Sequence, residues 1–174
     1  MFDIHFVTHD QLTEIILLEV IRLKSSAWNY SYEDQVSWIN THIKDSDLHC
    51  FLSEDGVNVG YLNLIETNII VDDLSYRAYG VGNVCSIVRK KGYGSILLNY
   101  VNDFIVNKEY IGVLLCKPEL SHFYNKSGWK LVPYLKLLCE FSLTNIEMMT
   151  YNCEFNYKPV SYTHLRAHET GRNL

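Results

Sequence analysis

A short basic segment with two glycines, residues 89–94, has residue types and a spacing that suit the binding of an anion. It reads Arg-Lys-Lys-Gly-Tyr-Gly, follows an apolar run and leads directly into an amphipathic segment. A turn that opens a helix presents unpaired main-chain N–H groups at the positive end of the helix dipole. Gly92 and Gly94 have no Cβ, so an anion can approach the backbone closely there. The segment therefore predicts a site for a pyrophosphate group.

The segments on either side of this turn predict the elements that must position it. The apolar residues that follow recur at a spacing of about 3.6 residues, as on one stripe of a helix: Ile96, Leu97, Val101, Phe104 and Ile105. The polar residues fall mostly on the opposite side: Asn99, Asn102 and Asp103. Before the turn, residues 78–88 predict a strand that contains Gly80 and Gly82. Glycines inside a strand indicate a bulge or the close approach of another backbone or a ligand.

A second pattern lies one helix further along the chain. Residues 110–116 form an apolar run typical of a buried strand, and residues 117–129 end in Phe-Tyr-x-x-x-Gly-Trp. In this order, the two patterns resemble the acyl-CoA pyrophosphate loop and the following strand and helix of the GNAT N-acetyltransferases. The resemblance is close over residues 78–132 and covers the other segments by their layout.

The resemblance implies which residues bind the coenzyme. The backbone of Asn83, Val84 and Cys85 would hold the pantetheine arm, and the N–H of Val84 or Cys85 would face the thioester oxygen. The pyrophosphate contacts would come mainly from main-chain N–H groups of Arg89, Lys91, Gly92, Tyr93, Gly94 and Ser95. Lys90 is expected to be solvated. From the residues alone, a plain core strand and a basic turn are the alternatives.

The resemblance also implies a catalytic role for Tyr124. Its phenol would protonate the departing thiolate of CoA, because a thiolate of high pKa needs a proton donor. A packing role for Tyr124 stays open, since the chain has 13 tyrosines. Glu66 is the candidate general base, with Asp72 and Asp73 as alternatives, because the family often places a water-linked carboxylate near this position.

Composition excludes several classes of protein. The chain has 174 residues, of which 48% are hydrophobic and 20% charged, as in one globular domain with a sizeable core. Its net charge of −5 disfavours a nucleic-acid partner. No apolar run is long enough for a membrane span, and no signal-peptide pattern is present. The five cysteines are widely spaced, which predicts reduced thiols in the cytoplasm and no metal site.

The remaining segments complete the layout. Strands are predicted at residues 2–7, 48–53, 59–67, 135–143 and 147–155, and helices at residues 8–24, 32–44 and 120–127. Thr8 and Gln11 are spaced as in a capping box, and Asp55-Gly56 favours a tight hairpin turn. This order resembles the GNAT fold, which implies an α/β (α+β) domain over residues 1–158. Its central mixed, mostly antiparallel sheet would have about seven strands flanked by helices.

Residues 159–174 differ in character from the rest of the chain. They resemble one reading frame of a sequencing-library adapter, so we expect a non-native tail there. A natural polar tail with two histidines is the alternative.

These features predict an N-acetyltransferase that transfers the acetyl group of acetyl-CoA to a primary amine of a small molecule or peptide by direct attack. Its partners would be acetyl-CoA and the amine, with neither nucleic acid nor membrane. The acceptor and the oligomeric state, a homodimer included, stay open. One alternative is a catalytically silent acyl-CoA-binding module. A nucleotide-binding domain is disfavoured, because the loop lacks the Gly-Lys-Ser/Thr ending of a P-loop and the first glycine of a dinucleotide fingerprint.

Overall fold

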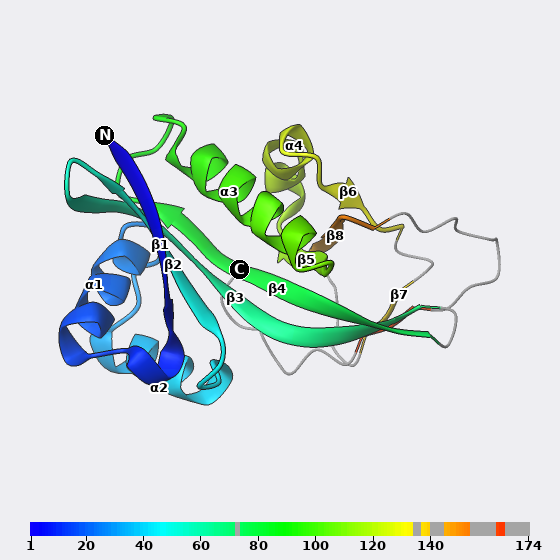
Figure 1. Cartoon of the computed structure of the whole chain (residues 1–174), viewed down its shortest axis with the longest axis horizontal. Coiled ribbons are helices and arrows are strands. Elements are labelled where there is room, and N and C mark those ends of the chain that lie inside the picture. Colours follow the sequence, from blue (N-terminus) through cyan, green and yellow to red (C-terminus); the bar gives the residue numbers. More distant parts are fainter. Residues whose placement is uncertain (72–73, 134–136, 140–144, 154–162, 166–174) are drawn as a thin grey trace. The chain divides into compact units, whose positions relative to one another are not determined.

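The computed structural model describes residues 1–71, 74–133, 137–139, 145–153 and 163–165. The chain divides into two compact units. Unit 1 comprises Met1–Ile65 and Gly82–Tyr100, and unit 2 comprises Glu66–Val81 and Val101–Leu174. Three long elements run through both units, namely β3 (Val57–Val71), β4 (Leu74–Ser86) and α3 (Tyr93–Asn107) (Figure 1).

Unit 1 contains the N-terminal strands and helices. Besides its parts of β3, β4 and α3, it holds β1 (Phe2–Thr8), the 3₁₀ helix η1 (His9–Gln11), α1 (Glu14–Ser25), α2 (Tyr32–His42) and β2 (Leu48–Glu54). β2 pairs antiparallel with β1 and with β3. The β2–β3 hairpin turns at Asp55 and Gly56, whose φ angles are 50° and 81°. This left-handed pair confirms the tight turn predicted from Asp-Gly.

Unit 2 contains the C-terminal elements. They are β5 (Ile111–Cys116), α4 (Pro118–Lys126), β6 (Lys130–Leu131), β7 (Leu137–Cys139), β8 (Glu147–Tyr151) and β9 (Thr163–Leu165). β4 and β5 pair in parallel at three positions, from Ala78 with Ile111 to Gly80 with Val113. β8 pairs antiparallel with β5 and with β6. β9 pairs with β3 and β7.

The predicted fold class is confirmed. The strands follow the order β1-β2-β3-β4-β5-β8-β6, with β7 and β9 off this path, and most pairings are antiparallel. The short strand β6 was not predicted. β9 lies in the segment predicted to be a non-native tail, which stays a prediction. No helix in the described ranges is long and apolar enough to cross a membrane.

The predicted start of the first helix is wrong. Thr8 precedes only the 3₁₀ turn η1, and its hydroxyl donates to Asp10. α1 begins at Glu14, six residues after the predicted start at residue 8, and the hydroxyl of its N-cap Thr13 accepts a hydrogen bond from the N–H of Ile16 at 3.3 Å. Both threonines fit the sequence pattern of an N-cap. Thr8 precedes a 3₁₀ helix of three residues, whereas Thr13 precedes the twelve residues of α1.

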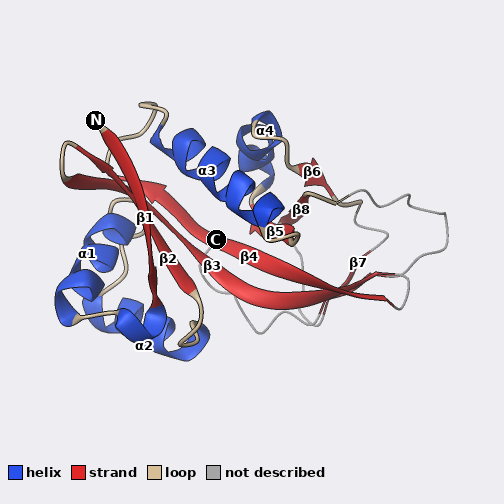
Figure 2. Ribbon diagram, in the orientation of Figure 1, coloured by secondary structure: helices blue, strands red, loops and turns tan. Residues whose placement is uncertain are grey.

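The sheet of unit 1 is packed on both faces because its side chains alternate. Phe51, Tyr61 and Cys85 lie in one core cluster with buried residues of α1 and α2, which lie next to each other in Figure 2. On the other face, a Cβ at Gly60 would lie only 2.8 Å from Cδ1 of Leu97. The absence of a side chain at Gly60 therefore lets α3 lie close against the sheet.

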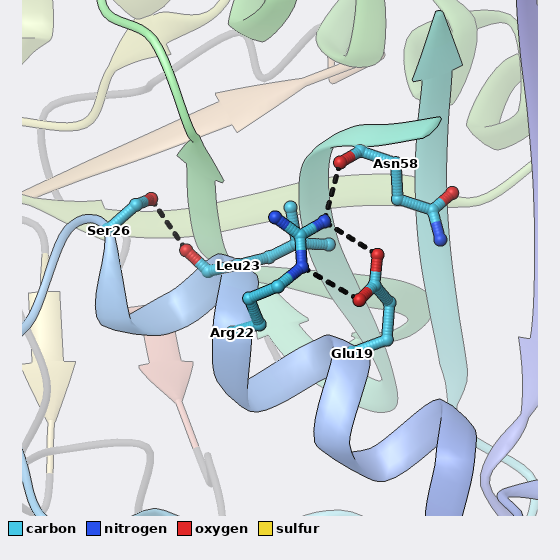
Figure 3. Close-up of polar contacts among 5 residues, drawn as sticks. All are labelled: Glu19, Arg22, Leu23, Ser26 and Asn58. Atoms are coloured by element: carbon cyan, nitrogen blue, oxygen red, sulfur yellow. Dashed lines mark hydrogen bonds and ion pairs between the residues drawn. The ribbon is translucent and has the colours of Figure 1, made fainter. Parts of the chain in front are cut away.

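Polar contacts attach α1 to the β2–β3 hairpin (Figure 3). The Arg22 guanidinium donates to both carboxylate oxygens of Glu19, at 2.8 and 2.6 Å, and to the carbonyl oxygen of Asn58 at 2.8 Å. The Ser26 hydroxyl donates to the carbonyl oxygen of Leu23 at 2.6 Å near the end of the helix. Of these contacts, the hydrogen bond from Arg22 to Asn58 is the one that joins α1 to β3.

Asn102 has a structural role that its predicted place on the polar side of α3 did not suggest. It is buried, its amide Nδ2 donates to the carbonyl oxygen of Ser127 at 2.8 Å, and its Oδ1 accepts from Nε1 of Trp129 at 3.0 Å. Trp129 is fully buried, so its N–H has no access to water. Asn102 thus joins the second half of α3 to the segment after α4.

Replacing Asn102 should destabilise the protein. We expect Asn102→Leu to lower the free energy of unfolding by about 1–3 kcal/mol, because the buried Trp129 N–H loses its acceptor. Asn99→Leu, at an exposed position of the same helix, should change it by less than about 0.5 kcal/mol. Urea denaturation measures both values, and equal effects of the two variants would contradict the proposed role.

Candidate active site

The end of β4 has an irregular backbone at the place where sequence predicts a bulge. Asn83 has a φ angle of 53°, which is uncommon for a residue other than glycine. Its Nδ2 donates to Oδ1 of Asn63 on β3 at 2.7 Å, and a Cβ at Gly82 would lie 3.1 Å from that same oxygen. Among the described strands of unit 1, β1 and β4 are the outermost, so residues 83–85 lie at one edge of this unit's sheet.

The turn after β4 leaves main-chain donors unpaired. Residues 87–92 are exposed, and Lys90 and Gly92 have φ angles of 65° and 82°. α3 begins at Tyr93, and its first helical hydrogen bond runs from the N–H of Ile96 to the carbonyl oxygen of Gly92 at 3.0 Å. The N–H groups of residues 93–95 find no acceptor in the described part of the chain. They therefore form the kind of site at which helices bind phosphate groups.

The charges around this turn favour an anion. Arg89, Lys90 and Lys91 are exposed, and none of them forms an ion pair with a described residue. The first turn of α3 has no acidic residue, although helices commonly place one there. The positive end of the helix dipole and three cations thus lie within one short segment.

Tyr93 takes part in this site through its backbone. Its side chain is buried, and its hydroxyl donates to Oε2 of Glu54 at 2.6 Å. That hydrogen bond is the main cause that raises the pKa of the phenol. The ring of Phe2 meets the Tyr93 ring edge-on, with the ring centroids 6.1 Å apart. These contacts fix the start of α3 and leave the Tyr93 N–H as the group available to a ligand.

Tyr124, the predicted general acid, lies on α4 in unit 2. Only 8% of its surface is exposed, and its ring packs against Phe123 and Trp129 with centroid distances of 5.0 and 6.5 Å. No described residue accepts or donates a hydrogen bond at its hydroxyl. Burial raises the pKa of the phenol, with a smaller contribution from Cys116. Tyr124 is therefore protonated at neutral pH, as a proton donor must be.

Glu66, the predicted general base, is occupied by two donors. Its Oε1 accepts from the Arg77 guanidinium at 2.6 Å and from the Tyr110 hydroxyl at 3.1 Å. The hydrogen bond from Arg77 is the main cause that lowers the pKa of this carboxyl. A lowered pKa makes Glu66 a weaker proton acceptor than a free carboxylate. The alternatives, Asp72 and Asp73, lie outside the described residues.

The predicted site residues divide between the two units. All nine coenzyme-binding candidates, from Asn83 to Ser95, lie in unit 1, and both catalytic candidates, Tyr124 and Glu66, lie in unit 2. In the described ranges, no group of three or more His, Cys, Asp or Glu side chains could hold a metal ion.

Sequence reasoning missed a polar layer inside unit 1. Nδ1 of His9 lies 3.1 Å from Nε2 of His49, and Nδ1 of His49 lies 2.7 Å from the hydroxyl of Tyr61. Lys24 is also buried in this unit, and its charge helps to lower the pKa of His49. The signal for these residues was present, since His49 and Tyr61 alternate with apolar residues in strands and Lys24 lies within an apolar helix.

Comparisons with known proteins establish the fold. The sequence matches no protein-family model and no curated protein. The structure is similar to ElaA of Escherichia coli, with a TM-score of 0.64, 16% identity, and coverage of 87% of this chain and 99% of that chain. It is similar to an acyl-CoA N-acyltransferase of Pseudomonas aeruginosa, with a TM-score of 0.63, 18% identity and the same coverage. A GCN5-related N-acetyltransferase of Kribbella flavida matches with a TM-score of 0.59 and 18% identity, over 75% of this chain and 33% of that chain.

The polar layer predicts a loss of stability in acid. Burial, and then the charges of His9 and Lys24, lower the pKa of His49 from 6.5 to about 4. Between pH 6.5 and pH 4, His49 therefore binds a proton in the unfolded chain but not in the folded chain. The contribution of His49 to the free energy of unfolding should therefore be complete above pH 6.5. It should fall by up to about 3 kcal/mol as the pH drops to 4.

Urea denaturation at several pH values measures this loss. His49→Gln should flatten the decline, whereas His122→Gln, at an exposed position, should leave it unchanged. An equally steep decline in both variants would show that other groups are responsible.

Proposed function

We propose that this chain, which has the fold of the GNAT acyltransferases, is an N-acetyltransferase that uses acetyl-CoA. It would transfer the acetyl group to a primary amine of a small molecule or peptide. The observation that carries this proposal is the first turn of α3, where three N–H groups have no described acceptor and exposed cations precede them. The similarity to an acyl-CoA N-acyltransferase supports a coenzyme of this class.

The coenzyme would bind through the backbone. The N–H groups of Tyr93, Gly94 and Ser95 would donate to the pyrophosphate oxygens, and Arg89 and Lys91 would add charge-assisted contacts. The pantetheine arm would lie along the edge of β4 at Asn83, Val84 and Cys85, because an extended amide chain can add to an open strand edge. The left-handed backbone at Asn83 supports this, since it turns the local N–H groups out of regular pairing.

The transfer itself needs few protein groups. The neutral amine nitrogen attacks the thioester carbonyl carbon, a C–N bond forms, and the C–S bond breaks with the electron pair on sulfur. One main-chain N–H of β4 would stabilise the developing oxyanion. Tyr124 would give its proton to the departing thiolate, and the excess proton on the amine would leave to a base such as Glu66 or to water. The Arg77 contact makes Glu66 the weaker of these assignments.

A catalytically silent acyl-CoA-binding module is the rival proposal. It would keep the α3 site and the β4 edge but would need no proton donor. The hydroxyl of Tyr124 favours the enzyme, because a buried tyrosine that serves only for packing usually pairs its hydroxyl, and this one has no described partner.

Charge removal in the turn should weaken coenzyme binding selectively. We expect Arg89→Ala and Lys91→Ala each to raise the Kd of acetyl-CoA about fivefold, since each removes a charged contact at an exposed site. Lys90→Ala is the matched control, because Lys90 is predicted to be solvated. Calorimetry with acetyl-CoA, ATP and NAD measures these values. Equal binding of all three ligands, or three variants with unchanged Kd, would contradict the proposed site.

Tyr124→Phe should separate binding from turnover. The variant should bind acetyl-CoA within about twofold of the original protein and lose about a hundredfold in kcat, most clearly at alkaline pH. Tyr151→Phe is the matched control, because its ring also packs against Trp129, at a centroid distance of 5.6 Å. Thiol release from acetyl-CoA measures kcat, and an unaltered rate would remove Tyr124 from the mechanism.

A further inference from the structure

Unit 1 contains a group of buried polar atoms that have no hydrogen-bond partner among the described residues. They are Nζ of Lys24, Oε1 of Gln35, Nε1 of Trp38, Nδ2 of Asn63 and Oδ1 of Asn83. Buried polar atoms in native proteins nearly always have a partner. Two pairs of these side chains lie together, Lys24 with Trp38 and Asn63 with Asn83, and their unpaired atoms are candidate contacts of a polar ligand.

Lys24 is the strongest of these indications. Its side chain is 2% exposed, and it forms neither a hydrogen bond nor an ion pair with a described residue. Its Nζ lies 4.4 Å from the centroid of the Trp38 ring, the side chain with the second unpaired donor. Burial lowers the pKa of Lys24 to about 8, so the amine still carries its proton at pH 7. A buried ammonium without a counter-charge is costly.

The titratable groups that interact with Lys24 cannot supply that counter-charge. Burial raises the pKa of the Cys85 thiol to about 12 and that of the Tyr61 phenol well above its ordinary value. His49 can be only neutral or positive, and burial lowers its pKa. All three are uncharged at pH 7. The face of the Trp38 ring gives Lys24 a cation–π contact but no counter-charge, so an anionic group of a ligand would be a favourable partner for it.

These atoms lie beside the strand segment assigned to the thioester. Cys85 packs in the same cluster as Leu23, the neighbour of Lys24, and as Trp38. Asn83 lies two residues before Cys85 on β4, so its unpaired Oδ1 adds an acceptor at the same end of the strand. The unpaired donors of α1 and α2 and the unpaired acceptor of β4 thus belong to elements that pack together around Cys85.

We propose that the acceptor substrate is an amine that also carries a carboxylate, as a free amino acid does. Lys24 and Trp38 would donate to the carboxylate, and Asn83 Oδ1 would accept a hydrogen bond from the amine. This inference rests on the proposed acetyltransferase function and specifies its substrate class. Lys24 would recognise the carboxylate of the substrate and would take no part in proton transfer.

The test compares amino acids with the amines that lack only the carboxylate. The pairs are phenylalanine with 2-phenylethylamine, leucine with isoamylamine, and lysine with cadaverine. Thermal unfolding in the presence of coenzyme A measures binding, and thiol release from acetyl-CoA measures turnover. At least one amino acid should raise Tm and turn over with a KM about tenfold below that of its partner, because it satisfies a buried charge.

Three variants assign that preference to its residues. Lys24→Met should abolish it and should not lower Tm without ligand, since it removes an uncompensated buried charge. Trp38→Phe keeps an aromatic side chain, removes the indole N–H and should weaken the preference. Lys44→Met, at an exposed position, is the control and should retain it.

Two results would overturn the inference. One is the absence of any preference for a carboxylated amine, which would mean that internal water satisfies Lys24. The other is a preference that persists in Lys24→Met. Calorimetry with coenzyme A is run on the same protein, so the two proposals fail separately. Coenzyme binding without a carboxylate preference overturns only the substrate class, and no coenzyme binding overturns the proposed function.

Discussion

The first turn of α3 is the feature on which the proposed chemistry depends. An α-helix cannot satisfy its own first N–H groups, so some partner outside the helix must accept them. Here the first turn has no acidic residue, and the preceding residues are exposed cations. Gly92 permits the left-handed backbone that brings the chain from β4 into the helix. The unpaired amides and the positive charges therefore both favour a diphosphate ligand.

The packing of unit 1 holds this turn in place. Leu97 lies against Gly60 on one face of the sheet, and Tyr93 is fixed by its hydrogen bond to Glu54. The other face packs against α1 and α2, which cover Phe51 and Cys85. β4 thus has a helix layer on each side, and its irregular end is joined to β3 by the hydrogen bond from Asn83 to Asn63. Such a rigid support suits a site that must position a thioester.

The electrostatics of the interior differ from those of the turn. The turn displays exposed cations, whereas the α1 and α2 side of the sheet buries one ammonium, Lys24, among neutral groups. Charge at an exposed position costs little, because water solvates it, but charge at a buried position needs a partner. The burial of Lys24 is therefore the more informative observation about a ligand. Tyr124 and Glu66 show the same dependence on surroundings, since burial keeps one protonated and Arg77 keeps the other ionised.

Local patterns in the sequence were sufficient for the order of the longer strands and helices, the Asp55-Gly56 turn, the irregular β4 end and the presence of a helix after the basic turn. Each of these depends on residues within a few positions of one another, so periodicity and turn chemistry predict them. The sequence could not show that Thr13 caps α1, that Asn102 holds Trp129, or that Lys24 lacks a partner. The role of a polar side chain is decided by which distant groups pack around it, and only the tertiary structure brings those groups together.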